Sequence, residues 1–433
     1  MRMAYLINTY PMISQTFIMR EIHRLRELGC EVETLSIEGP DRPFEELTAE
    51  ERLEAAAAKV MAQSGIAGAL IAHFATLVTM PWRWMRGLLF ALSLAGTDVG
   101  RVFELLSRFS QALQAGRWMR RRGLTHLHVA DGASEASAAM IASKIFPITF
   151  SFSARGAEEF FDAAGKNLTE AIEHAAFVTC ADHYTRSQLM MMTPPVEWEK
   201  FEIALPGVSL EAFKPVAKPV VADAFEILSV GDLIPARGQH ALIAAVDRLV
   251  NQEGRNLRLR LVGEGPDRSL LEAQIDGAGL WANVLFEGAL DHERIRSFYA
   301  NADAFVLPSF AEGAPIGLLE AMAMEIPCIS THIPGIPELI RDGMDGLLTA
   351  PSDVVELADA IAELMDNQIL RVELAAAGRE RVLRRHNIEQ TLPRLMAIFQ
   401  ERIGDQPVRE GRDEAAEGMS MAIAPAARAS FSQ

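Results

Sequence analysis

The regular alternation of short apolar strands with helices most constrains the fold of this chain, and it occurs twice along 433 residues. Residues 3–7 form an apolar run typical of a buried strand, and from Ser14 the apolar residues recur at helical spacing up to Gly29. Residues 32–37 then alternate as a second strand. A strand, a helix and a strand in so short a stretch indicate a βαβ unit, whose two strands are parallel.

The interruptions of this alternation predict two domains. A mostly helical insertion follows the first unit, the alternation resumes at residues 126–129, and a second series starts at residue 225 after a proline-rich stretch. We therefore expect an α/β protein with two doubly wound Rossmann-like domains facing a central cleft. The expected ranges are 1–205 for the first domain with its insertion at about 44–122, 206–385 for the second domain, 386–403 for a carboxyl-terminal helix that returns to the first domain, and 404–433 for a disordered tail.

The charge is strongly acidic but unevenly distributed. Asp and Glu number 58 against 41 Lys and Arg, a net charge of −17, which argues against general nucleic-acid binding because a phosphate backbone requires a basic surface. Between Trp82 and Arg122, however, eight arginines face two acidic residues, a local charge of +6 that leaves −23 for the rest of the chain. These arginines are Arg83, Arg86, Arg101, Arg108, Arg117, Arg120, Arg121 and Arg122.

This basic stretch has two interpretations. It also holds Trp82, Trp84 and Trp118 beside apolar helical faces, a combination that suits an anionic membrane surface. The alternative is a basic helical face packed on its own domain or on an acidic partner. Residues 65–80 are apolar but fall short of the roughly 20 residues that a membrane span requires. We expect a cytoplasmic protein, with or without peripheral contact with the inner face of the membrane at residues 82–122.

Cysteine spacing and the amino-terminal sequence agree with that location. Cys30, Cys180 and Cys328 are far apart and form no CxxC pair, so neither a zinc site nor a disulfide framework is expected. The chain opens directly on a short strand without the pattern of a signal peptide.

His126 and His128 alternate along a strand, and without a third ligand in view we interpret them as structural. We expect no metal and no cofactor.

The segment from Pro308 to Met322 carries the densest chemistry. A strand ends at residue 307, a glycine- and proline-rich loop follows, and a helix begins near Ile316. Free backbone amides and the positive end of the helix dipole form an anion site there. Glu312 on the loop and Glu320 one turn into the helix can accept hydrogen bonds from a hydroxyl-rich ligand. The alternative is a tight turn that binds nothing.

Two further glycine turns follow strands that end at the same cleft. Arg237 and Gly238 close the first turn, and Arg237 can hold a diphosphate bidentately. Gly263 and Gly265 form the second, but Arg268 occupies the third position of a dinucleotide fingerprint, so an oxidoreductase is disfavoured. The chain has neither a phosphate-binding P-loop nor an Asp-x-Asp pair, the usual marker of metal-dependent sugar-nucleotide chemistry.

In combination these segments resemble family 4 of the retaining glycosyltransferases, which have the GT-B fold. The resemblance rests on Val-Gly-x-Leu-x-Pro-x-Arg-Gly (230–238), Leu-Val-Gly-Glu-Gly-Pro (261–266), the Glu312-x7-Glu320 pair and Pro-Gly-Ile-Pro-Glu-Leu-Ile (334–340) with Asp-Gly-Leu-Leu (345–348). Residues 10–18 resemble the opening motif of the branch that acts in exopolysaccharide and colanic-acid-type synthesis. The family implies metal-independent transfer, with retention, from a nucleotide-diphospho-sugar to a glycan or a polyprenyl-diphosphate-linked acceptor.

The resemblance also assigns roles to residues of this chain. It implies that Glu312 and Arg155 are catalytic and that Glu320 faces the ribose. It also implies that the first domain binds the acceptor, with Ser14, Gln15 and His128 on its loops. The implied donor-binding residues are Arg237, Gly238, Gly263, Gly265, Gly313, Pro315, Ile316, Gly317 and Glu320.

Four positions depart from the family pattern. Gln15 replaces a Glu, Ala130 and Arg155 each replace a His, and Asp232 stands where the family has a diphosphate-binding Arg. A carboxylate about 4 Å from a diphosphate charge costs about 4 kcal/mol at an effective dielectric constant of about 20, unless it is screened. Two rivals to the glycosyltransferase therefore stay open: a degenerate homologue that acts as a membrane-associated binding protein, and a sugar-nucleotide epimerase on the same fold, against which the Glu312-x7-Glu320 pattern argues.

Overall fold

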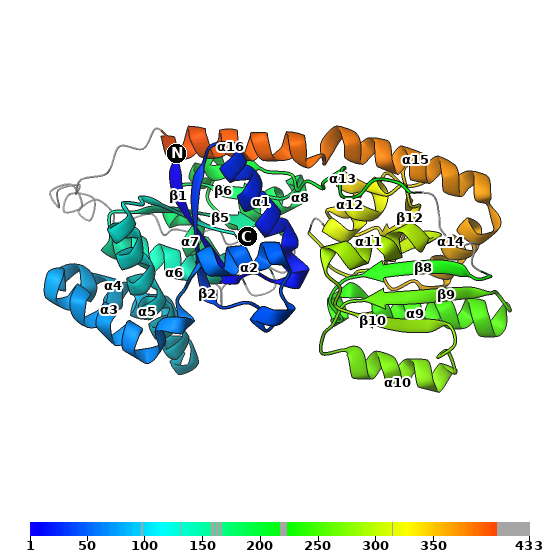
Figure 1. The fold of residues 1–433 in the computed structure, drawn as a ribbon, viewed down its shortest axis with the longest axis horizontal. Helices are drawn as coiled ribbons and strands as arrows, with labels where there is room; N and C mark the ends of the chain where they lie inside the picture. Colours follow the sequence, from blue (N-terminus) through cyan, green and yellow to red (C-terminus); the bar gives the residue numbers. More distant parts are fainter. Residues whose placement is uncertain are drawn as a thin grey trace, which may run out of the picture.

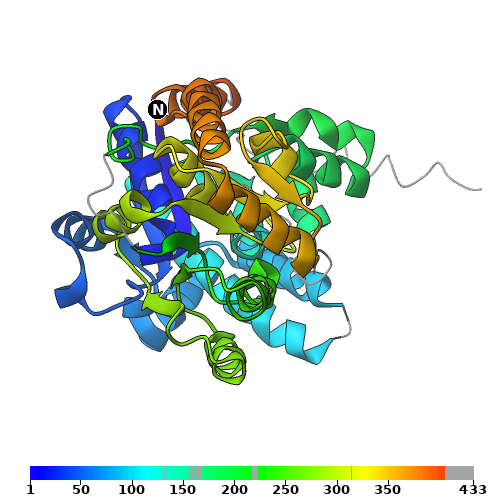
Figure 2. The same ribbon diagram turned by 90° about the vertical axis from the view of Figure 1, so that its right-hand side faces the viewer.

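The computed structural model describes residues 1–96, 98–130, 132–156, 160, 163, 167–216, 223–313 and 315–404, and within them it contains two parallel β-sheets (Figure 1). The first sheet has the order β3-β2-β1-β4-β5-β6-β7 and the second the order β10-β9-β8-β11-β12-β13. Figure 2 views the molecule from the side of the second domain. The predicted fold class, two Rossmann-like α/β domains, is confirmed. The predicted tail from residue 405 lies outside the described residues.

The strands of the two sheets have the following bounds. They are β1 (Arg2–Thr9), β2 (Glu31–Glu38), β3 (Lys59–Val60), β4 (His126–Val129), β5 (Thr149–Ala154), β6 (Val178–Cys180), β7 (Phe201–Ile203), β8 (Phe225–Val230), β9 (Leu257–Val262), β10 (Val284–Gly288), β11 (Ala304–Leu307), β12 (Cys328–Thr331) and β13 (Leu347–Thr349).

The α-helices have the following bounds, with the 3-10 segment of the first-domain cleft loop; another 3-10 segment, η6 (Pro235–Arg237), carries Arg237. They are η1 (Ile13–Gln15), α1 (Thr16–Glu27), α2 (Ala49–Ala57), α3 (Gly65–Thr79), α4 (Pro81–Ala95), α5 (Val99–Arg122), α6 (Gly132–Ile145), α7 (Leu168–His174), α8 (His183–Met192), α9 (Gln239–Asp247), α10 (Arg268–Ala278), α11 (His292–Asn301), α12 (Ile316–Ala323), α13 (Ile336–Leu339), α14 (Val354–Asp366), α15 (Gln368–Arg385) and α16 (Ile388–Gly404).

The position of strand β1 explains the unbroken apolar run at its residues 3–7. It pairs with β2 on one side and β4 on the other, so it is central in its sheet. Ala4 and Leu6 join the apolar core under α5 and α6, whereas Met3, Tyr5 and Ile7 join a second core with α1 and α16. Both faces of a parallel sheet are covered, so both sets of side chains must be apolar.

The insertion adds a strand that the sequence analysis did not predict. Lys59 and Val60 pair with Leu35 and Ser36 and extend the sheet beyond β2. Two residues are too few to show a period in the sequence, so this strand depends on the edge of β2 rather than on a pattern of its own. The rest of the insertion is mainly helical, and α3, α4 and α5 lie at the end of the molecule farthest from the second domain (Figure 1).

Helix α16 connects the end of the described chain back to the first domain. Along the top edge in Figure 1, α15 covers the second domain and α16 covers the first. Leu392, Leu395, Met396 and Phe399 of α16 are buried in the core that contains Tyr5. The chain thus crosses between the domains twice, before β8 and again before α16.

The two crossings lie side by side. The backbone amide of Val208 donates to the carbonyl of His386 at 2.8 Å, and the amide of Ile388 donates back to Val208 at 3.1 Å. The ring of His386 also contacts the carbonyl oxygen of Pro206 at 3.0 Å. One hydrogen-bonded pair of segments therefore joins the two domains.

Removing the Phe399 side chain tests the docking of α16. This ring is fully buried and lies edge-to-face against Tyr5, His128 and Phe177. We expect Phe399→Ala to lower the free energy of unfolding of the first domain by about 3–5 kcal/mol, the usual cost of an aromatic cavity, measured by urea denaturation. Gln400→Ala on the exposed face of the same helix is the control, and an equal loss in both variants would contradict the assignment.

Candidate functional site

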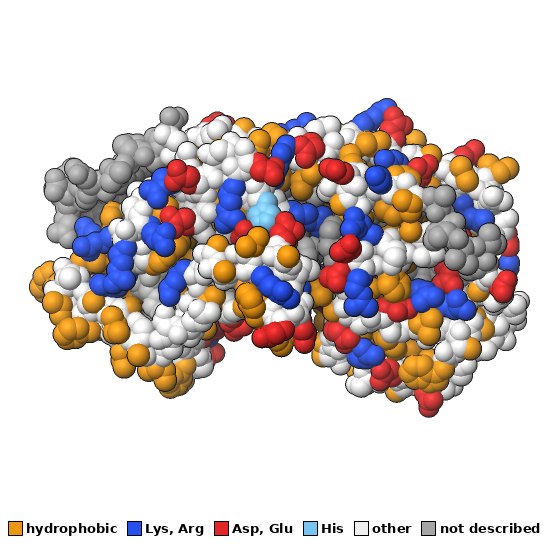
Figure 3. Space-filling model, viewed as in Figure 1, with side chains coloured by type: hydrophobic (Ala, Val, Ile, Leu, Met, Phe, Trp, Pro, Cys, Tyr) orange, Lys and Arg blue, Asp and Glu red, His pale blue; other side chains and the backbone are white. Residues whose placement is uncertain are grey.

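A cleft of about 680 Å³ lies between the carboxyl ends of the two sheets, where the strand order of each sheet reverses. A notch between the two domains is visible along the lower edge of the space-filling view (Figure 3). The first domain contributes residues 12–17, Arg155, Gly156 and Ala181, and Pro206 lines the cleft where the chain crosses between the domains. The second contributes Val230, Gly231, Asp232, Ile234, Arg237, Val262, Gly263, Glu264, Gly265, Ala289, Leu290, Ile295, Leu307, Glu312, Gly313, Pro315, Ile316, Gly317, Leu318 and Glu320.

Most of the residues that the sequence singled out line this cleft, and two do not. Gly238 lies behind it at the start of α9, with φ +68° and so little space that a Cβ would come 2.1 Å from the carbonyl oxygen of Pro308. His128 was expected on an acceptor loop, and the structure corrects this. It lies within β4, fully buried, where its ring nitrogens contact the hydroxyls of Ser151 and Ser153 at 2.8 and 3.1 Å.

The burial of His128 also decides its charge. Burial lowers the pKa of His128 well below its usual value, and nearby Arg155 lowers it further. The ring is therefore neutral at physiological pH. His126 is likewise buried between Thr149 and Ser151, so the interpretation of both histidines as structural agrees with their surroundings.

The two glycine turns of the second domain fit directly against each other. The amide of Gly231 donates to Val262 and that of Leu233 to Glu264, both at 2.9 Å. A Cβ on Gly263 would approach the carbonyl oxygen of Gly231 to 2.1 Å. A side chain at this position would force the turns apart, so glycine is required for the close backbone packing that forms this wall of the cleft.

Glu312 and Arg237 form an ion pair at the cleft wall. The carboxylate is buried and also accepts a hydrogen bond from the Ser309 hydroxyl at 2.8 Å. The loop that carries Glu312 is held to the Arg237 turn, because the amide of Phe310 donates to Ala236 at 2.8 Å. A diphosphate that binds here would compete with Glu312 for the guanidinium group of Arg237.

Glu320 is the most strongly perturbed carboxylate of the cleft. It is buried near the start of α12, and Tyr299 donates to one of its oxygens at 3.2 Å. Arg20, which comes from α1 of the other domain, reaches its second oxygen at 3.4 Å. Burial raises the pKa of Glu320 to about 6, although Arg20 and Tyr299 oppose the shift. The carboxyl group of Glu320 is thus about half ionised near pH 6 and mostly ionised at pH 7 and above.

Arg155 faces the cleft but is held within its own domain. Its guanidinium group contacts Glu21 at 3.2 Å and donates to the carbonyl of Ala130 at 2.9 Å. It also lies over the ring of Phe17, 4.9 Å from the ring centre. Tyr5 donates to the same Glu21 carboxylate at 3.1 Å. These contacts fix the cation at the cleft wall.

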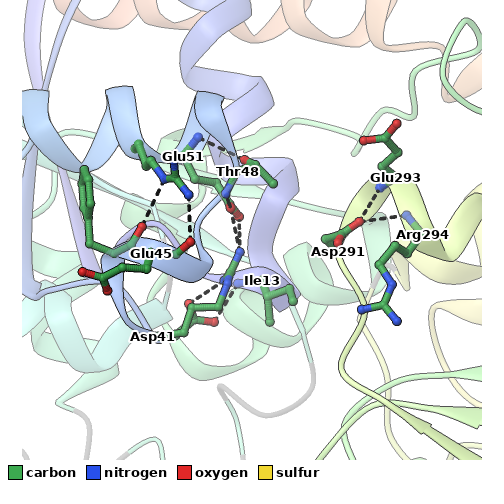
Figure 4. A network of polar contacts seen from close by, with 11 residues as sticks. Ile13, Asp41, Glu45, Thr48, Glu51, Asp291, Glu293 and Arg294 are labelled. Carbon is green, nitrogen blue, oxygen red and sulfur yellow. Dashed lines mark hydrogen bonds and ion pairs between the residues drawn. The ribbon is translucent and has the colours of Figure 1, made fainter.

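Acidic residues at and just before the insertion hold the segment at Ile13, which precedes Ser14 and Gln15 (Figure 4). Asp41 accepts a hydrogen bond from the amide of Ile13 at 2.8 Å. Arg42 joins Asp41 to Glu51, which completes a capping box with Thr48 at the start of α2. The position of this cleft loop therefore depends on residues outside the cleft.

On the other side of the view in Figure 4, Asp291 begins α11 of the second domain. Its side chain accepts hydrogen bonds from the amides of Glu293 and Arg294 at 3.0 and 2.8 Å. Leu290 and Ile295, which flank this cap, line the cleft. The cap thus fixes the apolar part of the second-domain wall.

Asp232 lies at the cleft and its side chain is exposed. Solvent screens an exposed charge, so the repulsion expected for a diphosphate in a low-dielectric site is reduced. Arg237 lies next to the same turn, with its side chain 3.6 Å from the place of a Cβ on Gly231.

The two domains touch at the floor of the cleft, which the sequence did not reveal. A Cβ on Gly313 would lie 1.8 Å from the carbonyl oxygen of Arg155. Glu338 accepts hydrogen bonds from the amides of His183 and Tyr184 at 3.0 and 2.8 Å, so a carboxylate of one domain caps helix α8 of the other. Among the described residues, no group of three or more His, Cys, Asp or Glu side chains is placed to hold a metal ion.

Comparison with known proteins agrees with this geometry. Residues 213–381 match the family model of glycosyl transferases group 1. Alpha-D-kanosaminyltransferase of Streptomyces kanamyceticus is 31% identical over 175 residues, 40% of this chain and 45% of the relative. The putative colanic acid biosynthesis glycosyltransferase WcaL of Escherichia coli is 34% identical over 170 residues, 38% and 42% of the two chains. The alignments thus span less than half the length of these curated relatives.

Solved structures extend the similarity to the whole fold. Sucrose-phosphate synthase of Thermosynechococcus elongatus superposes with a TM-score of 0.73 over 94% of this chain and all of that one, at 18% identity. HepE of Anabaena in complex with UDP-glucose superposes with a TM-score of 0.68 over 93% and 99% of the two chains, at 16% identity. The chain has the GT-B fold, and the part of its second domain at residues 213–381 is similar to the group 1 glycosyl transferases.

Replacing Glu320 with Gln should change how stability depends on pH. Because the folded-state pKa is raised from 4.5 to about 6, the ionised carboxylate lowers stability as the pH rises through this range. A neutral Gln lacks this effect, so the stability of Glu320→Gln relative to wild type should rise by about 1–2 kcal/mol between pH 4.5 and pH 7.5, measured by urea denaturation. Exposed Glu363→Gln is the control, and a difference independent of pH would refute the shift.

Adding one methyl group at Gly313 should separate the domains. Its Cβ would overlap the carbonyl of Arg155, so Gly313→Ala is expected to increase the radius of gyration in small-angle scattering and to lower the melting temperature. Gly277→Ala in helix α10, where a Cβ meets no atom within 4 Å, is the matched control and should leave the radius of gyration unchanged and not lower the melting temperature. If the two variants behave alike, the floor contact does not hold the domains together.

Proposed function

We propose that this chain is a retaining, metal-independent glycosyltransferase of the family-4 type. It would transfer a sugar from a nucleotide-diphospho-sugar to a glycan or lipid-linked acceptor in the synthesis of a cell-surface polysaccharide. The observation that carries the proposal is the second-domain wall of the cleft. This wall brings together Arg237, Glu312, the amino-terminal end of α12 and Glu320. The colanic acid and amylovoran names of similar proteins support the polysaccharide class.

Each cleft group has a role in donor binding. The backbone at Gly313 and Gly317 and the dipole of α12 attract the diphosphate, and Arg237 adds a fixed positive charge. Ionised Glu320 accepts hydrogen bonds from ribose hydroxyls. Glu312 lies beside Arg237 and faces the donor sugar once the diphosphate engages that arginine. Arg237 and the dipole of α12 would offset part of the charge of the leaving diphosphate without a metal ion.

The acceptor would enter from the first domain. Ser14 and Gln15 border the cleft on the loop that Asp41 fixes, and Arg155 stands at the adjacent wall. Contact of the two domains excludes water from the activated sugar, which limits hydrolysis. In this proposal the leaving diphosphate helps to remove the proton of the acceptor hydroxyl, so no further protein base is required.

Calorimetric titration with a panel of nucleotide-diphospho-sugars tests the donor site. Wild-type protein should bind one member of the panel, with or without EDTA, and UDP-glucose is the first candidate because a fold neighbour is described in complex with it. Arg237→Ala should weaken binding about 10- to 100-fold, because it removes a charge-assisted bond to the diphosphate. Arg248→Ala, which removes an exposed ion pair with Asp359, should bind as wild type does.

Two further outcomes decide between the proposal and its rival. Absence of binding to every member of the panel would sink the glycosyltransferase proposal. Binding without turnover, together with increased turnover in the double variant Asp232→Arg and Arg155→His, would indicate a degenerate binding protein instead. Retention is tested separately by the anomeric coupling of the product in NMR spectra.

A further inference from the structure

Two consecutive helices of the insertion expose long apolar side chains along one stripe each. Ile66, Leu70 and Phe74 recur every four residues on α3. Each of these residues, and also Ile71, is 62–82% exposed. Trp82, Met85 and Leu89 follow at helical spacing on α4, with Trp82 85% exposed. We call these six residues, without Ile71, the α3–α4 surface. Figure 3 shows hydrophobic side chains gathered at this end of the molecule, far from the second domain.

The opposite face of α3 is fixed to the domain, so the exposure does not reflect a detached helix. Ala72 and Thr76 are buried. His73 contacts the Ser110 hydroxyl at 2.9 Å and accepts a hydrogen bond from the indole of Trp84 at 3.3 Å. By length and composition the helical stretch from Ala62 to Thr79 could cross a membrane, and 11% of it is buried. Its packing against α4 and α5 favours a helix that lies along a membrane rather than through it.

The charged residues of helices α3 and α4 themselves are all basic. Residues 55–97 contain no Asp or Glu, although the whole chain has 58 such residues. Arg83 and Arg86 are exposed on α4. Arg120 of α5 reaches the sulfur of Met80, 3.7 Å away, at the junction of α3 and α4. These three cations therefore border the apolar stripes.

Several other arginines of the basic stretch bind their own domain. Arg122 pairs with Glu33 at 3.1 Å, and Arg108 with Glu135 at 3.8 Å. Arg101 donates to the side-chain oxygen of Asn167 at 2.6 Å. Membrane contact through the whole of residues 82–122 would have to break these contacts. The apolar stripes of α3 and α4 require no such change.

We propose that the α3–α4 surface inserts its apolar side chains into the boundary region of an anionic lipid bilayer, with Arg83, Arg86 and Arg120 at the headgroups. Trp82 lies in the first turn of α4. Because its ring is amphipathic, it would sit at the level of the lipid headgroups. An anionic bilayer is the favoured occupant, because the two helices that form the surface carry only basic charged residues beside their exposed apolar side chains. The proposal goes beyond sugar transfer and does not depend on it.

Flotation of the full chain with lipid vesicles, without any sugar nucleotide, tests this proposal. Wild-type protein should float with vesicles of phosphatidylcholine and phosphatidylglycerol in a 3:1 ratio. The triple variant Leu70→Ser, Phe74→Ser and Trp82→Ser should lose at least tenfold in apparent affinity. The matched control Val355→Ser, Ile369→Ser and Val372→Ser changes three exposed apolar residues of the second domain and should float as wild type does.

The remaining outcomes separate the membrane from its rivals. Arg83→Gln with Arg86→Gln should weaken binding to anionic vesicles more than to pure phosphatidylcholine. The proposal is overturned if wild-type protein does not float, or if the triple serine variant floats equally well. It is also overturned if light scattering shows a wild-type dimer that the serine variant dissociates while neither protein binds vesicles. Calorimetry of nucleotide binding to the same variants shows that the cleft is intact.

Discussion

Parallel pairing within each sheet is the constraint from which the site follows. Every strand of a parallel sheet points the same way, so the loops that leave the strands gather along one edge. In this chain the carboxyl edges of the two sheets face the same cleft, where residues as distant in sequence as Gln15, Arg155, Gly263 and Glu320 come together. The glycine turns, the helix end and the buried carboxylates are useful only because this geometry places them opposite one another.

Buried charges connect the two sides of the cleft. Arg20 and Glu320 belong to different domains, and each has lost most of its water, which costs free energy that their mutual attraction and the Tyr299 hydrogen bond offset in part. Glu312 and Arg237 form a second pair within one domain. A ligand with its own negative charges and hydroxyls would exchange partners with these pairs. Ligand binding and domain contact are thereby coupled through the same few side chains.

The sequence predicted the parts of the site that depend on local spacing. Strand ends, glycine turns and the Glu312–Glu320 pair are all readable within about ten residues, and the structure brings them to the cleft. Arg20 and Tyr299 were not predicted, because an ordinary helical position gives no signal that its side chain meets a residue 300 positions away. The predicted placement of His128 on a loop was wrong. The residue lies inside β4, and the loop begins only two positions later in the sequence. The exposure of α3 was equally unreadable, since apolar composition alone does not distinguish a core helix from a surface one.

The paired crossings between the domains limit how the cleft can open. The segments at Val208 and Asn387 run in parallel and are hydrogen-bonded to each other, so they act as one hinge rather than two independent tethers. Bending at this hinge changes the cleft width, whereas twisting one domain about the other would shear the hydrogen bonds between the segments. The hydrogen bonds between the paired segments therefore oppose twisting of the two domains more than bending.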